Sequence, residues 1–311
     1  MSTFNRHREF SDTQEIRRAV RGYGWDIDYT RTGPGDLGVA AWETHLGDLL
    51  LYREHFEFPM LAYGASPFDA FSVMTVQRGT LRAYGEQLSS QGIILFPLGA
   101  EIDLVGSSDL ELFHVQVSQE RLVAEAQAAE VELAVSNRAL LVAPGPDRIR
   151  HFAQAMEHGN AILAAGDVAA WEEAEKDLVT LLVAVFDKEA VSRMRTRESI
   201  GTMPEYAIRA RSYVHSRLPG ELDIDGLAEK MGVTRRHLNR CFKDHYGMSL
   251  QDFIHYRRLH EAHNLLRQHP VGLNVTQAAY TCGFNHLGRF STQYKQLFGE
   301  SPRQTLRPAS V

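Results

Sequence analysis

The sequence predicts an α+β protein with two domains, an N-terminal β-barrel with trailing helices followed by an all-α domain. Three observations support this prediction. The chain has 311 residues, about twice the ~150 residues of a typical domain. Short β-like runs fill much of the first half, whereas helical patterns fill the second. The charge also divides, because residues 205–311 hold 15 Lys and Arg against 9 Asp and Glu, although the whole chain has a net charge of -6.

The charge division sets the domain boundaries that we expect. Residues 1–204 have a net charge of -12 and residues 205–311 a net charge of +6. Such asymmetry indicates that one half meets a polyanion. Residues 188–204 are polar, which is typical of a linker or a frayed helix end. The expected domains are 1–187, with a barrel at about 35–118 and helices at about 119–187, and 205–307, with 188–204 as linker.

The composition excludes several classes of protein. At 44% hydrophobic and 23% charged residues the chain is globular rather than disordered or fibrous. It has no run of ~18 apolar residues, and the polar stretch 1–10 does not resemble a secretory signal. Two cysteines, Cys241 and Cys282, cannot build a disulfide framework or a four-cysteine zinc site. We therefore expect a cytoplasmic protein with no membrane partner and no cofactor.

The N-terminal half shows many short strand patterns separated by turns. The clearest strands are expected at 49–52, 71–76, 80–84, 92–96 and 110–117. The turns are expected at 78–79, 84–85, 97–99 and 107–109. Strands of this length and spacing predict a barrel or jelly roll. Its aromatic residues could line an effector pocket, but we favour the hydrophobic core for them; they are Trp42, Tyr52, Phe71, Tyr84 and Phe96.

Residues 119–187 change to helical periodicity. Helices are expected over 119–135, 147–165 and 171–186, the last with an apolar stripe at helical spacing. These helices could pack on the barrel, or they could form a dimer contact. Both alternatives remain open at this point.

The C-terminal half contains an internal repeat. Ala228 and Gly232 stand four residues apart, as do Ala279 and Gly283, and an amphipathic helix follows each pair. In a helix-turn-helix a small residue lets the second helix approach the first, and a glycine takes the left-handed conformation that ends the first helix. Two matches in one basic half predict two helix-turn-helix units.

The second helix of each unit has one polar face and one apolar face at 100° per residue. In the first unit Arg236, Asn239, Arg240 and Lys243 share a face opposite Leu238. In the second unit, Arg289, Thr292, Gln293 and Gln296 share a face opposite the aromatic residues. Arg, Asn and Gln side chains match the edges of bases in the major groove. The alternative, an ordinary solvated surface helix, is disfavoured because the turn motif precedes both faces.

A single helix is expected between the two units, over 249–268, with Ser249 as its N-cap. Twenty residues at 1.5 Å each span ~30 Å, and successive major-groove faces lie ~34 Å apart. Such a helix could set two reading helices in adjacent major grooves, so that one chain covers an asymmetric site of about two turns.

At this point the sequence resembles a known family. Residues 205–307 look like the DNA-binding domain of the AraC/XylS family of bacterial transcription regulators. The resemblance rests on Leu227-Ala228, Gly232, Arg236, Leu238, Arg240 and Phe242, and on Ala278-Ala279, Gly283-Phe284, Phe290, Tyr294-Lys295, Phe298-Gly299 and Ser301-Pro302. The family usually closes with Pro-x-x-Tyr-Arg, whereas this chain has Pro302-Arg-Gln-Thr-Leu-Arg307. That ending, with His286-Leu-Gly-Arg-Phe290, resembles a branch that controls the catabolism of aromatic compounds and amines.

The resemblance implies a function and a set of contacts. The N-terminal domain would be a cupin-like barrel that senses a small effector, an aromatic acid or an amine, and forms a homodimer. The chain would bind promoter DNA, contact RNA polymerase and activate catabolic genes. Base contacts would fall on Arg236, Asn239, Arg240, His286, Arg289 and Thr292. Phosphate contacts would fall on Arg235, Lys243 and Gln293.

Two other functions are alternatives to a transcription regulator. A cupin-type metalloenzyme fused to a DNA-binding module would need a His-x-His pair on one strand. The N-terminal half has no such pair, and only His114 stands within a clear strand pattern. A lone strand histidine is more typical of a core or pocket residue, and the chain shows no nucleophile elbow, Walker loop or Rossmann fingerprint. The second alternative is a helical protein-interaction module in the C-terminal half. We therefore expect no enzyme activity.

Overall fold

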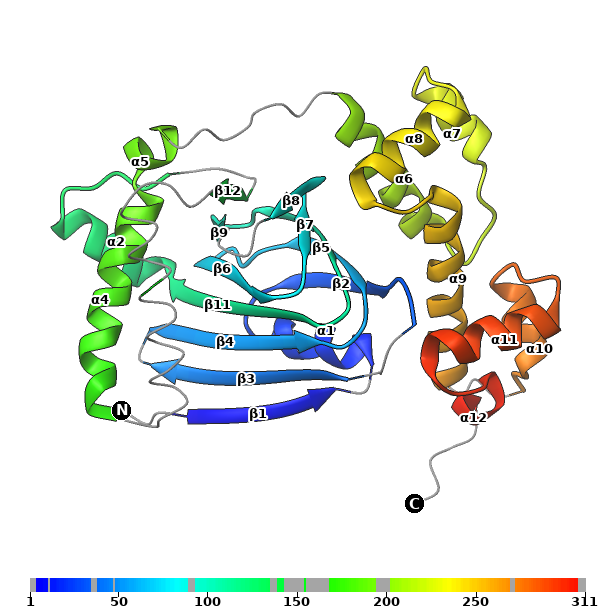
Figure 1. Ribbon diagram of the computed structural model, residues 1–311, viewed down its shortest axis with the longest axis horizontal. Helices are drawn as coiled ribbons and strands as arrows, with labels where there is room; N and C mark the ends of the chain where they lie inside the picture. Colours follow the sequence, from blue (N-terminus) through cyan, green and yellow to red (C-terminus); the bar gives the residue numbers. More distant parts are fainter. Residues whose placement is uncertain are drawn as a thin grey trace.

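The computed structural model describes residues 4–10, 12–34, 38–46, 48–88, 93–134, 139–142, 154, 168–193, 202–268 and 272–306. Within these residues a sheet-rich N-terminal half lies beside a helical C-terminal half (Figure 1). The predicted class, with a β domain followed by an all-α domain, is confirmed.

The N-terminal half is built from two antiparallel sheets. One has seven strands in the order β1-β3-β4-β11-β6-β9-β12 and the other has five in the order β2-β5-β10-β7-β8. The first sheet consists of β1 (Phe4–Phe10), β3 (Val39–Leu46), β4 (Leu49–Phe56), β11 (Leu110–Ser118), β6 (Ala70–Arg78), β9 (Ile93–Phe96) and β12 (Leu140–Val142). The second consists of β2 (Asp26–Arg31), β5 (Met60–Ala65), β10 (Glu101–Gly106), β7 (Leu81–Ala83) and β8 (Glu86–Leu88).

All five predicted strands are present, as β4, β6, β7, β9 and β11. The turns also stand where they were expected, and Gly79, Gly85 and Gly99 adopt positive φ in them. The sheet region begins earlier than the predicted residue 35, because β1, α1 (Thr13–Arg21) and β2 precede it. The sequence FNRHREF of β1 lacks an apolar alternation, and it pairs on one side only, with β3.

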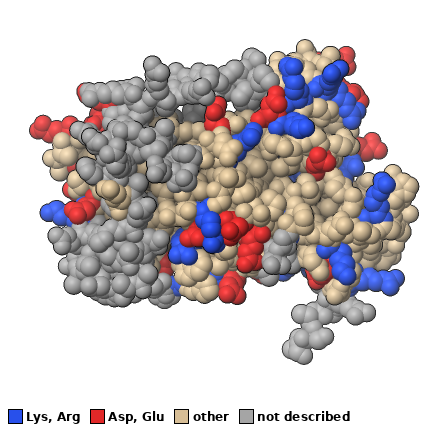
Figure 2. Space-filling model, viewed as in Figure 1, with Lys and Arg blue, Asp and Glu red and all other residues tan. Residues whose placement is uncertain are grey.

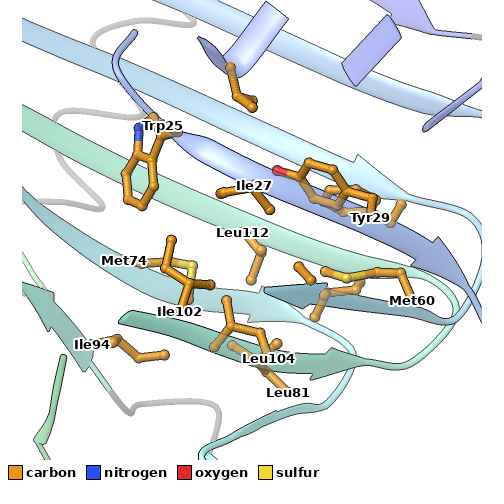
Figure 3. Close-up of a cluster of buried hydrophobic side chains, with 14 of the residues drawn as sticks. Trp25, Ile27, Tyr29, Met60, Met74, Leu81, Ile94, Ile102, Leu104 and Leu112 are labelled. Atoms are coloured by element: carbon orange, nitrogen blue, oxygen red, sulfur yellow. The ribbon is translucent and has the colours of Figure 1, made fainter. Parts of the chain in front are cut away.

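The hydrophobic core of this half lies between the two sheets (Figure 3). Ile27 and Tyr29 of β2 and Ile102 of β10 point toward Met74 of β6 and Leu112 of β11. All of these side chains are less than a tenth exposed. Each large apolar side chain buried in this way contributes about 1.5–3 kcal/mol to folding, so the interior of the sandwich is a packed core.

The outer face of the seven-stranded sheet is covered by α2 (Gln119–Ala128) and α4 (Val168–Phe186). The helix expected over 171–186 is therefore confirmed, and Leu178, Leu182 and Phe186 are buried against the sheet. The helix expected over 119–135 is too long: α2 ends at Ala128. The chain turns there because Val131 and the residues after it pack on the same cluster, and the amide of Ala134 donates to the carbonyl of Phe186.

The helix expected over 147–165 lies outside the described residues, apart from residue 154. Helices occupy both ends of the segment expected as a linker, since α5 spans Lys188–Arg193 and α6 spans Thr202–Arg217.

The C-terminal half docks on the outer face of the five-stranded sheet. Neighbouring strands align Asp28, Tyr63 and Asp103 in one row, and because side chains alternate along a strand this row points away from the core. The hydrophobic cluster of the first helix-turn-helix includes Leu61 and Tyr63 of β5. The two halves therefore share an apolar contact, and polar groups are buried beside it.

Asp103 sits at one end of this row and is fully buried. Nη1 of Arg211 in α6 donates to its Oδ1 at 2.7 Å, and Nε2 of His245 lies 2.5 Å from its Oδ2. The hydroxyl of Tyr246 donates to Oδ2 at 3.3 Å. Three groups of the helical half thus converge on one carboxylate of the sheet.

Asp28 sits at the other end of the row. Nη1 of Arg257 donates to Asp28 Oδ2 at 3.1 Å, and the Tyr63 hydroxyl donates to the same oxygen at 2.8 Å. Burial acts to raise the pKa of Asp28, but Arg257, Tyr63 and Arg17 outweigh it, so that this pKa lies below its ordinary value. Asp28 is therefore charged at neutral pH, and it balances the buried Arg257.

Replacing Asp103 with Asn should reduce the free energy of unfolding by about 3 kcal/mol, because it leaves the Arg211 guanidinium buried without its closest counter-charge. Urea denaturation followed by circular dichroism measures this change. The matched control is Asp109→Asn, since Asp109 is 62% exposed and pairs with Arg78 at the surface. This substitution should lower the free energy of unfolding by less than about 1 kcal/mol. Equal effects of the two substitutions would contradict this account of Asp103.

Candidate nucleic-acid interface

The first helix-turn-helix consists of α7 (Ile224–Lys230) and α8 (Arg235–Tyr246). Asp223 caps α7 through the amide of Gly226, and Thr234 caps α8 through the amide of His237. Gly232 has φ +68° in the turn, which is the left-handed conformation expected for a glycine that ends a helix. The predicted turn chemistry is therefore confirmed in the first unit.

The second helix-turn-helix consists of α10 (Val275–Thr281) and α11 (Leu287–Phe298). Asn274 and Gln277 form a reciprocal capping box at the start of α10. Gly283 has φ +80°. Ala279 is fully buried, and Ala228 in the first unit is only 2% exposed. The two units thus share the same local structure, with a small buried residue in the first helix and a left-handed glycine after it.

Helix α9 (Leu250–Arg267) joins the two units, and Ser249 is its N-cap as expected. Its 18 residues span ~27 Å at 1.5 Å each. Figure 1 shows α7 and α8 near one end of α9 and α10, α11 and α12 (Pro302–Leu306) near the other. The distance between the two units is therefore set by one rigid helix.

The predicted burial of α8 is confirmed. Leu238, Cys241 and Phe242 are buried in the core of the first unit. The opposite face carries the predicted contact residues: Arg235, Arg236, Arg240 and Lys243 are exposed and Asn239 is half-buried.

The same division holds in α11. Phe290, Tyr294 and Phe298 are buried in the core of the second unit. The predicted contact residues lie outside it, since His286, Arg289 and Thr292 are exposed and Gln293 is half-buried. Lys295 and Gln296 are also exposed on α11. They complete a polar surface with no carboxylate within the helix.

Three of these side chains have partners within the protein. Nη1 of Arg235 lies 2.9 Å from a carboxylate oxygen of Asp225 in α7, and Nη2 of Arg240 lies 3.5 Å from Nδ1 of His237. The hydroxyl of Thr292 donates to the carbonyl of Gly288 at 3.1 Å. Arg235 is thus held toward α7 at the edge of the face. Arg236 and Arg289 are exposed and form no ion pair within 4 Å with any of the described residues.

The distribution of surface charge agrees with an exposed basic face on the first helix-turn-helix. Figure 2 shows Lys and Arg side chains gathered over the part of the molecule where α7 and α8 lie, with fewer Asp and Glu beside them. An exposed basic surface attracts the phosphate backbone of a nucleic acid. Arginines on an exposed helix face can add bidentate contacts to guanine.

The sequence analysis did not reveal that α9 buries polar side chains. Arg257, His260 and His263 are buried. Arg257 and His260 reach the sheet, where Nε2 of His260 accepts from the amide of Arg31 at 2.9 Å. The spacing of Arg257, His260, Glu261 and Asn264 at three and four residues was the signal for this face.

His114 is a buried residue, as the sequence indicated. His114 of β11 is buried, stacks on Tyr52 at 4.2 Å between ring centroids, and has Nε2 3.2 Å from Glu54. Among the described residues no three His, Cys, Asp or Glu side chains are grouped so that they could hold a metal ion.

The aromatic residues considered for a pocket are dispersed. Tyr52 and Phe96 lie in the core between the sheets, and Phe71 lies in the cluster beneath α4. Trp42 and Tyr84 are half-buried, with Arg53 over the Trp42 ring. They do not line one common cavity.

Comparison with known proteins matches a helix-turn-helix family and several transcription regulators. A family model described as "Helix-turn-helix domain" matches residues 227–308. The HTH-type transcriptional regulator GlxA of Rhizobium meliloti (strain 1021) is 32% identical over 122 residues, which are 39% of this chain and 37% of that protein. The probable thc operon regulatory protein of Rhodococcus erythropolis is 32% identical over 146 residues, 47% of this chain and 43% of that protein. The chain thus spans about two fifths of the length of these relatives.

Among solved structures, a probable AraC family transcriptional regulator from Rhodopseudomonas palustris CGA009 is 32% identical. The match covers 33% of this chain and 99% of that one, with a TM-score of 0.31. In the part of this chain that the structure describes, none of the helices has the length and apolar character to span a membrane.

Replacing Gly232 with Ala should lower the free energy of unfolding by about 1–2 kcal/mol. A Cβ at this position meets no atom within 4 Å, so the whole cost arises from the left-handed φ of +68°. Gly288→Ala is the matched control, because Gly288 lies inside α11 and its Cβ also meets nothing. The Gly288→Ala substitution should raise the free energy of unfolding by about 0.5–1 kcal/mol. Thermal unfolding of both variants checks the opposite signs, and destabilisation by both would contradict the role given to the turn.

Proposed function

Because the chain belongs, through its C-terminal helix-turn-helix domain, to the AraC/XylS family, we propose that it is a ligand-responsive transcription regulator that binds promoter DNA. One observation carries this proposal. Two basic, outward-facing helices, α8 and α11, are held by the single rigid helix α9. A helix of this length places two reading helices close to the ~34 Å repeat of the major groove.

The contacts divide by chemistry. Arg236, Asn239, Arg240, His286, Arg289 and Thr292 read base edges, since their donors and acceptors lie on or beside the exposed faces. Arg235, Lys243 and Gln293 bind phosphates at the edges of those faces. Asn239 and Gln293 are half-buried, which restricts their rotamers and favours defined hydrogen bonds.

The wider role follows from the same family. The chain acts in the cytoplasm on catabolic genes, as an activator that contacts RNA polymerase, and it forms a homodimer through the N-terminal half. The dimer contact is proposed from the family resemblance alone, because the apolar stripe of α4 is buried against the sheet and its exposed Lys176, Asp177 and Thr180 are polar. We propose no catalytic role. The competing metalloenzyme function predicts stoichiometric Fe, Mn or Ni in the purified protein, which metal analysis tests.

Arg236→Ala and Arg289→Ala should each weaken binding to a site selected from random DNA duplexes by about 10- to 100-fold, because each loses a bidentate base contact. Gel-shift titration measures the Kd. Arg209→Ala is the control, since Arg209 is an exposed residue of α6 that pairs with Glu205 and belongs to neither reading helix; its Kd should stay within about twofold. If both reading-helix variants bind as tightly as the unsubstituted chain, the assigned contacts are wrong.

Lys243→Ala should instead weaken binding to all sequences alike. Loss of one phosphate contact lowers the slope of log K against log salt by about 1. Titrations at several salt concentrations check this slope, with Arg209→Ala again as the control. An unchanged slope would place Lys243 outside the interface.

A further inference from the structure

The interior of the N-terminal sandwich has little room for an effector. The cavity between the sheets, lined by residues such as Trp25, Tyr52, Met74 and His114, has a volume of only about 20 Å³. A single water needs about 10–15 Å³ of such space. The core side chains in Figure 3 therefore fill the interior of the sandwich, as the sequence analysis favoured for Tyr52 and Phe96.

A much larger cavity, of about 270 Å³, lies between the two halves of the chain. On the sheet side it is lined by the start of α1, by Arg31 at the end of β2 and by Phe58. On the helical side it is lined by His263 and Arg267 of α9 and by the end of α11. Any occupant of this cavity touches both halves at once.

Flat surfaces form much of the cavity wall. The Arg31 guanidinium lies over the Phe58 ring, 5.0 Å from its centroid. On the other side the His263 ring stacks on Phe298 with centroids 4.3 Å apart and planes 17° apart. An occupant with a ring can pack between these surfaces and gain apolar and stacking contacts.

The neutral histidines show the electrostatic character of this wall. Burial, aided by the charge of Arg267, lowers the pKa of His263 to about 4. Burial also lowers the pKa of His260 to about 3, aided by Arg257. Both imidazoles are therefore uncharged at neutral pH, and the charge that acts on His263 is that of Arg267.

The carboxylates of the cavity are already engaged. Asp12 caps α1 through the amides of Gln14 and Glu15, and it pairs with Arg267. Glu300 accepts from the hydroxyl of Thr305 at 2.6 Å. A guanidinium has five N–H donors, more than the contacts of Arg267 with Asp12 and Glu15 use. Arg267 is 43% exposed, so it can accept a further anion without rearrangement of the core.

We propose that this interdomain cavity binds a small aromatic carboxylic acid, with its ring between Phe58 and Phe298 and its carboxylate on Arg267. An amine is disfavoured, since it would bring a cation against Arg31 and Arg267. The proposal rests on the proposed function, because it assigns the effector of that regulator to the domain interface. A ligand that touches both halves stabilises their docked arrangement, and by linkage it changes the affinity of the chain for DNA.

Calorimetric titration of the full chain with benzoate tests the site. Benzoate should bind and benzylamine should not. Arg267→Met should weaken benzoate binding at least tenfold through loss of a charge-assisted hydrogen bond. Glu300→Gln should tighten it severalfold, because it removes a negative charge from the wall; a purely structural role of the cavity would not produce this opposite sign. Arg303→Met is the matched control, since Arg303 is exposed on α12 and does not line the cavity.

Absence of benzoate binding would overturn the proposal, as would benzoate binding that is indifferent to both Arg267→Met and Glu300→Gln. Gel shifts on the same samples separate this result from the proposed function. DNA binding without benzoate binding would contradict the aromatic-acid site and support the proposed DNA-binding function. Benzoate binding that depends on Arg267, in a chain that binds no DNA, would contradict the proposed function and support the site.

Discussion

Two buried carboxylates on the outer face of the five-stranded sheet hold the rest of the structure in place. Asp28 and Asp103 lie at the ends of one cross-strand row, with Tyr63 between them. A carboxylate removed from water is costly unless it is paired and hydrogen-bonded. Their main partners, Arg257 and Arg211, come from the helical half. The sheet therefore requires the helical half to dock with α6 and α9 on this face.

This constraint explains features of the helical half that DNA binding does not. Helix α9 buries Arg257 and His260 on a second face, because that face lies on β2. The C-terminal end of α8 is also anchored, since His245 bonds to Asp103 and Arg82 donates to the carbonyl of Asp244 at 2.7 Å. The face of α8 that we propose contacts DNA remains exposed in this arrangement. Docking and the proposed DNA contact thus use different sides of α8.

The sequence predicted the parts of the fold that depend on local chemistry. Both helix-turn-helix units were found because caps, helical periodicity and left-handed glycines such as Gly232 and Gly283 act within a few residues. Strand β1 and the early end of α2 were missed, because β1 depends on its partner β3 and Val131 depends on a distant hydrophobic cluster. The row of Asp28 and Asp103 could not be predicted, since the two strands meet only through β5. The interdomain cavity was missed for the same reason: its walls come from both ends of the chain.

The central claim is that Asp28 and Asp103 fix the position of the helical half. The most direct measurement is the distance distribution between spin labels on two exposed residues, Gln87 of β8 and Gln296 of α11, by pulsed electron paramagnetic resonance. The account predicts a single narrow distribution in the chain with both carboxylates and a broad one after Asp28→Asn and Asp103→Asn are combined. A narrow distribution that survives both substitutions would contradict it.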